Sequence, residues 1–314
     1  MQLLALFGGL DITSLFRASP GYIAQGAIWG IMALGLYISY KLLDFSDLTV
    51  DGSFATGAAV TVMLILAGWP AWAAMLAAIL AGMAAGFITG ILHTVLGIAP
   101  ILAGILTQIA LYSINLHILG NKANQAVSVD KYELLLSLRT VNSAILVALA
   151  LAAVLIAVFY WFFGTELGSA IRATGCNPSM AKAQGINISA MKVLALSLSN
   201  GIVALAGGLL AQYQGFADVQ MGRGAIVIGL ASIIIGQVLI DLLFPKVSHF
   251  VLALSSAVLG GILYYIAMGI VLWLKLPTND MKLFTAIIVA VFLAVPNLKN
   301  KATFGRRKEE KTDA

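Results

Sequence analysis

The sequence predicts an all-α integral membrane protein with about nine transmembrane helices. Of the 314 residues, 61% are hydrophobic and 10% are charged, whereas soluble domains carry about 25% charged residues. The mean hydropathy is +1.00, and residues 52–121 contain no Asp, Glu, Lys or Arg. A water-soluble fold has no place for such a stretch, so a soluble enzyme and a nucleic-acid-binding protein are excluded despite the net charge of +5. The apolar segments are continuous and not alternating, which excludes a membrane β-barrel.

The predicted spans follow from the lengths of the charge-free stretches. A helix needs about 20 apolar residues to cross a bilayer, so the run 52–121 holds three spans. The remaining apolar stretches raise the total to nine, with eight and ten as alternatives. Because proline fits the first turn of a helix, Pro20 is expected to open the first span and Pro100 the fourth. The nine predicted spans are 20–40, 52–68, 71–96, 98–119, 142–163, 191–213, 224–243, 247–273 and 282–296.

Charged residues mark the two ends of a single transmembrane domain, residues 19–298. Residues 1–18 lack the basic start of a signal peptide and carry Asp11, so we expect an N-terminal amphipathic segment at the membrane surface. The tail 299–314 is rich in Lys and Arg, which predicts a cytoplasmic C-terminus. Counting back through nine spans places loop 164–190 in the cytoplasm. The exact span count, and with it the side of the N-terminus, stays open.

Two short spans at corresponding positions indicate how the halves of the domain are related. The span 52–68 opens at Asp51 directly after the first span, and the span 224–243 opens at Gly222 directly after the sixth. Each has a charge-free run of 17 residues, which as a helix reaches only about 26 Å. Two inverted repeats with broken second helices, joined by one connecting span, fit this pattern, and such helices line the pathway of transporters. Two tilted but ordinary helices are the alternative.

Enzyme motifs and metal-binding motifs are absent from the sequence. It has no G-x-x-x-x-G-K-[ST] phosphate loop and no G-x-S-x-G nucleophile elbow. The three histidines lie in or beside different spans, and the single cysteine, Cys176, has no partner for an internal disulfide. We therefore expect no catalytic residue, no metal site and no cofactor in this chain.

The predicted span interiors contain essentially no ionisable side chain, although proton-coupled carriers need one. Neutral polar residues such as Gln108, Asn115, Asn200 and Gln237 are present instead, and they either bind a solute or link helices. Uphill transport would therefore take its energy from a partner protein.

Small residues recur at four-residue spacing in three of the spans. This spacing lets helices approach closely, and packing within the chain is favoured over dimer contacts. The positions are Gly26 and Gly30, then Gly82, Gly86 and Gly90, then Ala204 and Gly208.

The loop 164–190 is predicted to contain two short helices, at about 165–174 and 178–184. Asn177 is a good N-cap and is followed by proline, while Gly175 and Gly185 are good helix stops. Two capped helices make a rigid docking surface for a partner protein. An ordinary loop with helical turns is the alternative.

At this loop the sequence resembles a known family. The stretch 166–185, with Arg-Ala-Thr-Gly at 172–175, looks like the coupling loop of bacterial ABC-importer permeases of the branched-chain amino acid and ribose permease family. Residues 48–57 resemble the family's broken second helix. Residues 104–116 and 222–237 are similar to a subgroup that accompanies lipoprotein-type binding proteins, some assigned to tryptophan or tyrosine uptake. The resemblance covers about residues 20–296.

The resemblance implies partners and functional positions. Family members work as two permease subunits, here expected to be a homodimer, with two cytoplasmic ABC ATPases that bind ATP and Mg²⁺. An extracytoplasmic substrate-binding lipoprotein delivers the solute, and the complex resides in the bacterial inner membrane, with no nucleic acid among its partners. The ATPase-coupling residues would be Glu166, Arg172, Gly175, Asn177 and Gly185. Candidate residues of the substrate pathway are Ser53, Phe54, Thr107, Gln108 and Asn115.

These observations together predict the permease subunit of an ABC importer for a small organic solute, an amino acid or a related metabolite, that works by alternating access. A stand-alone secondary carrier or facilitator is the first alternative, and an intramembrane enzyme is the second. The sequence does not identify the solute.

Overall fold

The computed structural model describes residues 12–129, 131–243, 249–274, 283–287 and 289–291 of the chain. In this part of the chain, eight helices are long and apolar enough to cross a membrane, which confirms the predicted all-α membrane class. Within the same residues, sheet is limited to the short strands β1 (Asn124–Ala126) and β2 (Phe216–Asp218), which pair antiparallel with Gln125 opposite Ala217.

The observed helices match the first eight predicted spans closely. Of the ninth predicted span, 282–296, the structure describes only residues 283–287 and 289–291, which are helical, and the basic tail lies wholly outside the described residues, so the predicted inverted repeat stays a prediction. The membrane-spanning helices are α2 (Ile12–Tyr37) continued by the π-helix η1 (Ile38–Leu42), α3 (Thr49–Leu66), α4 (Ala71–Thr94), α5 (Pro100–Ile118), α6 (Val141–Gly164) preceded by η2 (Leu138–Thr140), α9 (Ile188–Gln214), α10 (Ala225–Leu243) and α11 (Phe250–Trp273).

The start of the first span differs from the prediction. Helix α2 begins at Ile12, so Pro20 lies inside the helix instead of opening it, and residues 12–18 of the predicted amphipathic segment belong to α2. Proline has no N–H for the carbonyl one turn earlier. The hydroxyl of Ser19 donates a hydrogen bond to that carbonyl, Phe16 O, at 2.8 Å, which replaces the missing donor.

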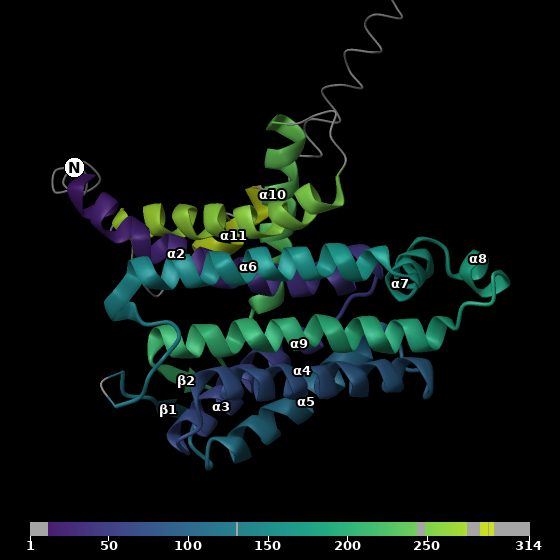
Figure 1. Ribbon diagram of the computed structural model, residues 1–314, viewed down its shortest axis with the longest axis horizontal. Helices are drawn as coiled ribbons and strands as arrows, with labels where there is room; N and C mark the ends of the chain where they lie inside the picture. The colour runs from purple at the N-terminus through teal and green to yellow at the C-terminus, as the bar shows by residue number, and fades with distance from the viewer. Residues whose placement is uncertain (1–11, 130, 244–248, 275–282, 288, 292–314) are drawn as a thin grey trace, which may run out of the picture.

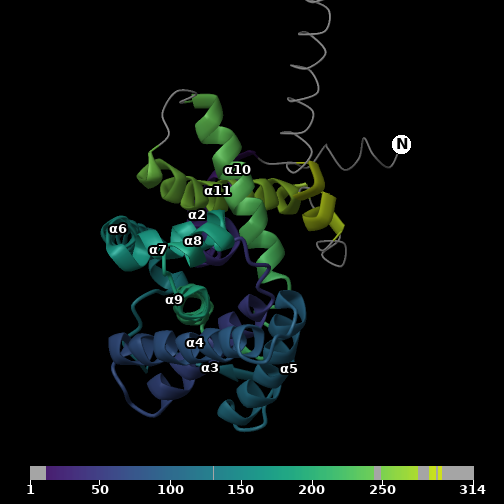
Figure 2. The same ribbon diagram turned by 90° about the vertical axis from the view of Figure 1, so that its right-hand side faces the viewer.

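The helices form a bundle around α9. Helices α2, α4, α6 and α9 run in similar directions in Figure 1, and α10 stands across the direction of α6 and α9 in both views (Figures 1 and 2). Helix α9 packs against α2, α3 and α4, and most of its side chains from Ala195 to Tyr213 are buried. Two short helices, α7 (Glu166–Cys176) and α8 (Pro178–Ala183), lie at the end of the bundle opposite to β1 and β2 (Figure 1).

The small-residue stripes predicted from the sequence lie at contacts within the chain. A Cβ atom on Gly82, Gly86 or Gly90 of α4 would collide with α9, and one on Gly26 or Gly30 of α2 would collide with α11. These glycines allow the helix backbones to approach more closely than side chains would permit. The prediction of intrachain packing is therefore confirmed for these stripes.

Gly57 is the tightest such contact of α3. A Cβ atom there would overlap the carbonyl group of Ala204 in α9. In an isolated helix, Gly→Ala stabilises by roughly 1 kcal/mol, but overpacking against a fixed backbone destabilises by about 1–3 kcal/mol. We therefore expect Gly57→Ala to lower the apparent melting temperature of the detergent-solubilised protein.

Gly164→Ala is the matched control, because Gly164 ends α6 with no atom within 4 Å of its Cβ position. An unchanged melting temperature in Gly57→Ala would show that α3 and α9 do not approach at this position.

Candidate functional site

The segment between η1 and α3 carries a carboxylate into the interior of the bundle. Residues 43–48 are not helical, and Asp47 is only 1% exposed. Its carboxylate accepts hydrogen bonds from Thr49 N at 2.9 Å and from Asn200 Nδ2 at 2.6 Å. Asn200 lies near the middle of α9, about 18 Å from either end of that helix. The prediction concerned the interiors of the spans, whereas Asp47 lies in a connection between two spans that folds back into the bundle, and its burial was not predicted.

Asn200 and three threonines extend this interaction into a buried polar seam between α3, α4, α5 and α9. Asn200 Oδ1 accepts a hydrogen bond from Ser53 Oγ at 2.6 Å. The hydroxyl of Thr89 lies 2.7 Å from that of Thr49 and donates to that of Thr107 at 2.8 Å. Asn200 thus links helices, one of the two roles left open by the sequence.

Three of the five candidate pathway residues belong to this packed interior. Ser53 and Thr107 are buried members of the polar seam. Phe54 is fully buried and stacks on Trp29, with ring centroids 4.9 Å apart. Their part in a substrate pathway stays a prediction.

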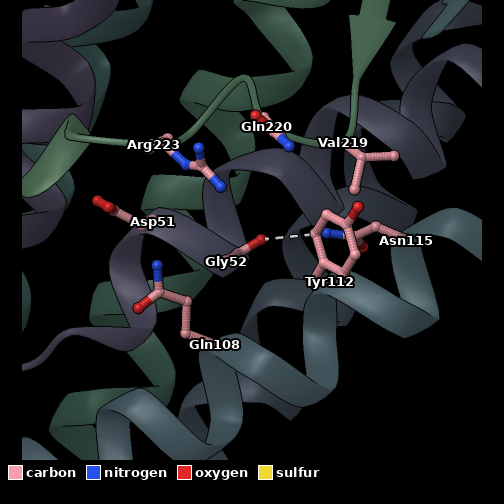
Figure 3. A pocket seen from close by; sticks show the side chains of 8 residues that line it. All are labelled: Asp51, Gly52, Gln108, Tyr112, Asn115, Val219, Gln220 and Arg223. Carbon is pink, nitrogen blue, oxygen red and sulfur yellow. Dashed lines mark hydrogen bonds between the residues drawn. The ribbon is translucent and has the colours of Figure 1, made fainter. Parts of the chain in front are cut away.

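The other two candidates, Gln108 and Asn115, line a common pocket (Figure 3). The pocket lies between the start of α3, one side of α5 and the connection from β2 to α10, and its volume is about 60 Å³. Its lining comprises Asp51, Gly52, Gln108, Tyr112, Asn115, Val219, Gln220 and Arg223. Asp51, Tyr112 and Arg223 lie in the stretches that resemble the permease family but were not named as candidate site residues, and the sequence offers no signal for Gln220.

Asp51 joins the starts of the two predicted broken helices. Its carboxylate accepts hydrogen bonds from Gly224 N at 2.9 Å and from Ile226 N at 3.0 Å. Gly224 directly precedes α10, and Ile226 is the second residue of that helix. Gly222 has no room for a Cβ atom against the Asp51 backbone, and Gly224 has φ +86°. A carboxylate is stabilised at a helix N-terminus by the free N–H groups and the helix dipole. The starts of α3 and α10 therefore meet at the pocket.

The loop after α6 folds into the two predicted helices. Thr165 Oγ1 accepts from Gly168 N at 3.4 Å at the start of α7, and Asn177 Oδ1 accepts from Met180 N at 3.0 Å at the start of α8. Gly185, with φ +80°, follows the end of α8. The predicted N-cap and the second glycine stop are thus confirmed.

Gly175 has a different role from the one predicted. Helix α7 continues through Gly175 to Cys176. A Cβ atom on Gly175 would collide with the carbonyl of Leu42 at the end of η1. The glycine therefore permits a close contact between α7 and the end of the first span and does not stop the helix.

The candidate coupling residues divide between two sides of this loop. Glu166, Asn177 and Gly185 are exposed. Arg172 is half-buried, and its guanidinium carbon lies 5.9 Å from the ring centre of Phe250, the first residue of α11. Arg172 and Gly175 thus contact the transmembrane bundle, while the other three face away from it.

The outward side of the loop also presents apolar side chains. Leu167 of α7 is 52% exposed, and Met180 of α8 is 62% exposed. Leu167 and Met180 are thus exposed apolar side chains on two short capped helices at one end of the membrane bundle.

Two of the three histidines have a hydrogen-bond partner close by in the sequence. His93 Nδ1 lies 2.9 Å from Ile98 O, and His117 Nδ1 lies 2.8 Å from Ser113 O. Among the residues that the structure describes, no group of three or more His, Cys, Asp or Glu side chains could hold a metal ion.

Comparison with known proteins agrees with these features. Residues 20–296 match the family described as branched-chain amino acid transport system, permease component. The chain is 41% identical to a tyrosine transport system permease protein of Clostridioides difficile (strain R20291) over 276 residues, 88% of this chain and 90% of that protein. It is 32% identical to an uncharacterized protein of Rickettsia prowazekii (strain Madrid E) over 274 residues, 87% and 95% of the two chains. No solved structure matches.

The family match covers every described helix from α3 to α11 and most of α2, and the more similar relative is aligned over nearly its whole length. Eight apolar helices of spanning length accompany this match. The chain therefore belongs to the family of branched-chain amino acid transport system permease components and is a multi-pass membrane permease.

Proposed function

We propose that this chain is the membrane-spanning subunit of a binding-protein-dependent ABC importer for amino acids, with tyrosine as the first solute to test. The observation that carries the proposal is the exposed surface of α7 and α8 at one end of the bundle, with Leu167 and Met180 outward. The similarity to a tyrosine transport system permease supports the choice of solute. A partner ATPase that binds ATP and Mg²⁺ would dock on this surface, and a binding protein would deliver the amino acid at the opposite end.

The inward side of the loop offers a route for coupling. Gly175 abuts Leu42 at the end of the first span, and Arg172 lies over Phe250 at the start of α11. A displacement of α7 by the ATPase would press on both helices. Nucleotide can shift the permease between its two orientations only through different affinities for them, and these contacts are where such a difference would enter the bundle.

Asp47 gives the alternative function a specific basis. A carboxylate near the middle of the bundle is the kind of group that a proton-coupled carrier uses. Its two hydrogen-bond donors, Thr49 N and Asn200 Nδ2, equally suit a structural anchor for the start of α3. Reconstitution of the chain alone in proteoliposomes separates the two functions, since a carrier transports without the ATPase and a permease subunit does not.

Met180→Asp tests the docking surface. Truncating or charging a central interface residue costs more than about 1 kcal/mol of binding free energy. We expect the ATPase to bind the variant about tenfold more weakly, which corresponds to about 1.4 kcal/mol, as measured by titration with the purified ATPase. Leu138→Asp is the control, because Leu138 is 51% exposed and precedes α6, whose other end leads into α7. Equal affinities for both variants and the parent protein would place the ATPase elsewhere.

Arg172→Glu tests the coupling route separately from docking. The charge reversal removes the contact with Phe250, so the ATPase should still bind while ATP-driven uptake falls. Residues on a coupling route change coupling by about 0.5–2 kcal/mol, so we expect about a fivefold loss of amino acid uptake in proteoliposomes. Lys122→Glu makes the same charge change in the distant loop before β1. Normal uptake in the Arg172 variant would remove this residue from the route.

Asp47→Asn distinguishes the permease from the carrier. The amide keeps an acceptor for Thr49 N and loses the acceptor of Asn200 Nδ2. A permease that does not use the charge of Asp47 should therefore retain most of its ATP-driven uptake. Asp47→Leu leaves Asn200 and Thr49 N without their acceptor, and a buried group that loses its partner costs about 1–3 kcal/mol. We therefore expect a larger fall in melting temperature for the leucine variant than for the asparagine variant. A well-folded asparagine variant that has lost all uptake would favour proton coupling through Asp47.

A further inference from the structure

We infer that the pocket of Figure 3 is a transit site for the zwitterionic head group of an amino acid, which is the ammonium and carboxylate on its Cα. The side chain of the bound amino acid would stay outside the pocket. The inference rests on the proposed amino acid permease function. It adds a binding site within the permease and the part of the solute that this site recognises.

The charges that line the pocket match a zwitterion. The lining contains one carboxylate, Asp51, and one guanidinium, Arg223, and its other side chains are neutral. Arg223 is exposed, and its charge interacts with that of Asp51, although its guanidinium forms no hydrogen bond with any other residue that the structure describes. A guanidinium binds a carboxylate through two parallel hydrogen bonds. Arg223 is therefore placed to receive the carboxylate of the solute.

Asn115 supplies the second half of the site. Its side chain is only 1% exposed; Nδ2 lies 3.5 Å from Gly52 O, and Oδ1 has no hydrogen-bond partner. A buried acceptor without a partner costs about 1–3 kcal/mol, and an ammonium N–H would satisfy it. The carboxylate of Asp51 also favours a cation nearby, because two N–H bonds leave it with further acceptor sites.

The size of the pocket limits what it can enclose. A volume of about 60 Å³ exceeds the roughly 10–15 Å³ that one water molecule needs, so it accommodates a few small polar groups. It does not accommodate an aromatic ring as well. Tyr112 is 46% exposed, and Gln220 and Arg223 are exposed, at the rim of the pocket. A bound amino acid would therefore direct its side chain out past this rim.

A cysteine-protection experiment tests the site in the full chain. Gln220→Cys places a thiol at the rim, and Cys176→Ser removes the exposed native cysteine. The protein is held in nanodiscs of phosphatidylglycerol, so that no zwitterionic lipid competes. The rate of N-ethylmaleimide modification is then measured by mass spectrometry with glycine, L-tyrosine, tyramine, ethylamine or acetate present.

We expect glycine and L-tyrosine to slow modification similarly, by about threefold at a concentration of about twice the Kd. Tyramine and ethylamine lack the carboxylate and acetate lacks the ammonium, so none of these should protect the thiol. Absence of protection by glycine would mean that the pocket holds water only. Equal protection by tyramine and L-tyrosine would mean that the site reads the side chain, and either result overturns the inference.

Variants assign the two halves of the site. Arg223→Gln and Asn115→Leu should abolish protection by glycine, whereas Asn115→Asp, which keeps an acceptor, should retain it. Lys122→Gln is the control outside the pocket. Melting temperatures identify any variant that fails to fold, and Arg223→Gln changes an exposed side chain. Protection that persists in Arg223→Gln contradicts the assignment.

Uptake by the parent chain, assembled with its ATPase and binding protein, separates this inference from the proposed function. Amino acid uptake without glycine protection removes the site and leaves the importer in place. Failure of ATP-driven uptake for every amino acid removes the proposed function itself, whatever the protection experiment shows.

Discussion

Lipid offers no hydrogen bonds, so every backbone group exposed by a break in a membrane helix must find its partner inside the protein. The structure meets this constraint with two aspartates. Asp47 accepts from the start of α3, and Asp51 accepts from the start of α10. Both carboxylates are themselves unfavourable at this depth unless donors surround them. The donors and the acceptors therefore depend on each other, and the positions of both helix starts follow from these contacts.

Glycine contacts determine which helices pack together around the starts of α3 and α10. Gly57 of α3 and Gly82 and Gly86 of α4 leave no space for a side chain against α9. Such close backbone contacts, with the buried polar seam beside them, join α3, α4 and α9 into one unit. Helix α10 touches this unit at few places and packs mainly against α11 and α2. Asp51 is thus one of the few connections between α10 and this unit.

Features encoded within a short stretch of sequence were predictable, and features created by folding were not. Hydropathy predicted the spans, and the Asn177 cap predicted the start of α8. The glycine spacing of α4 predicted a packing face, although not that α9 would be its partner. Gly175 was misassigned because a glycine stop and a glycine contact look alike without the neighbouring Leu42. The pocket combines residues from three segments distant in sequence, and Asp47 stands in a connection whose return into the bundle no local pattern marks.

The contacts between α10 and α11 would give the proposed coupling loop a route to the pocket. A Cβ atom on Gly236 of α10 would overlap Ser256 of α11, and one on Gly260 of α11 would overlap Ser232 of α10. Because these contacts are between backbones, α10 and α11 cannot slide past each other easily and would move as a pair. A push on Phe250 through Arg172 would therefore also displace the start of α10, which follows Arg223 and is hydrogen-bonded to Asp51 of α3. In the proposed importer, the nucleotide-driven displacement of α10 would then also change the contacts that the pocket makes with the amino acid head group. Helices α3 and α4 would stay in place against α9.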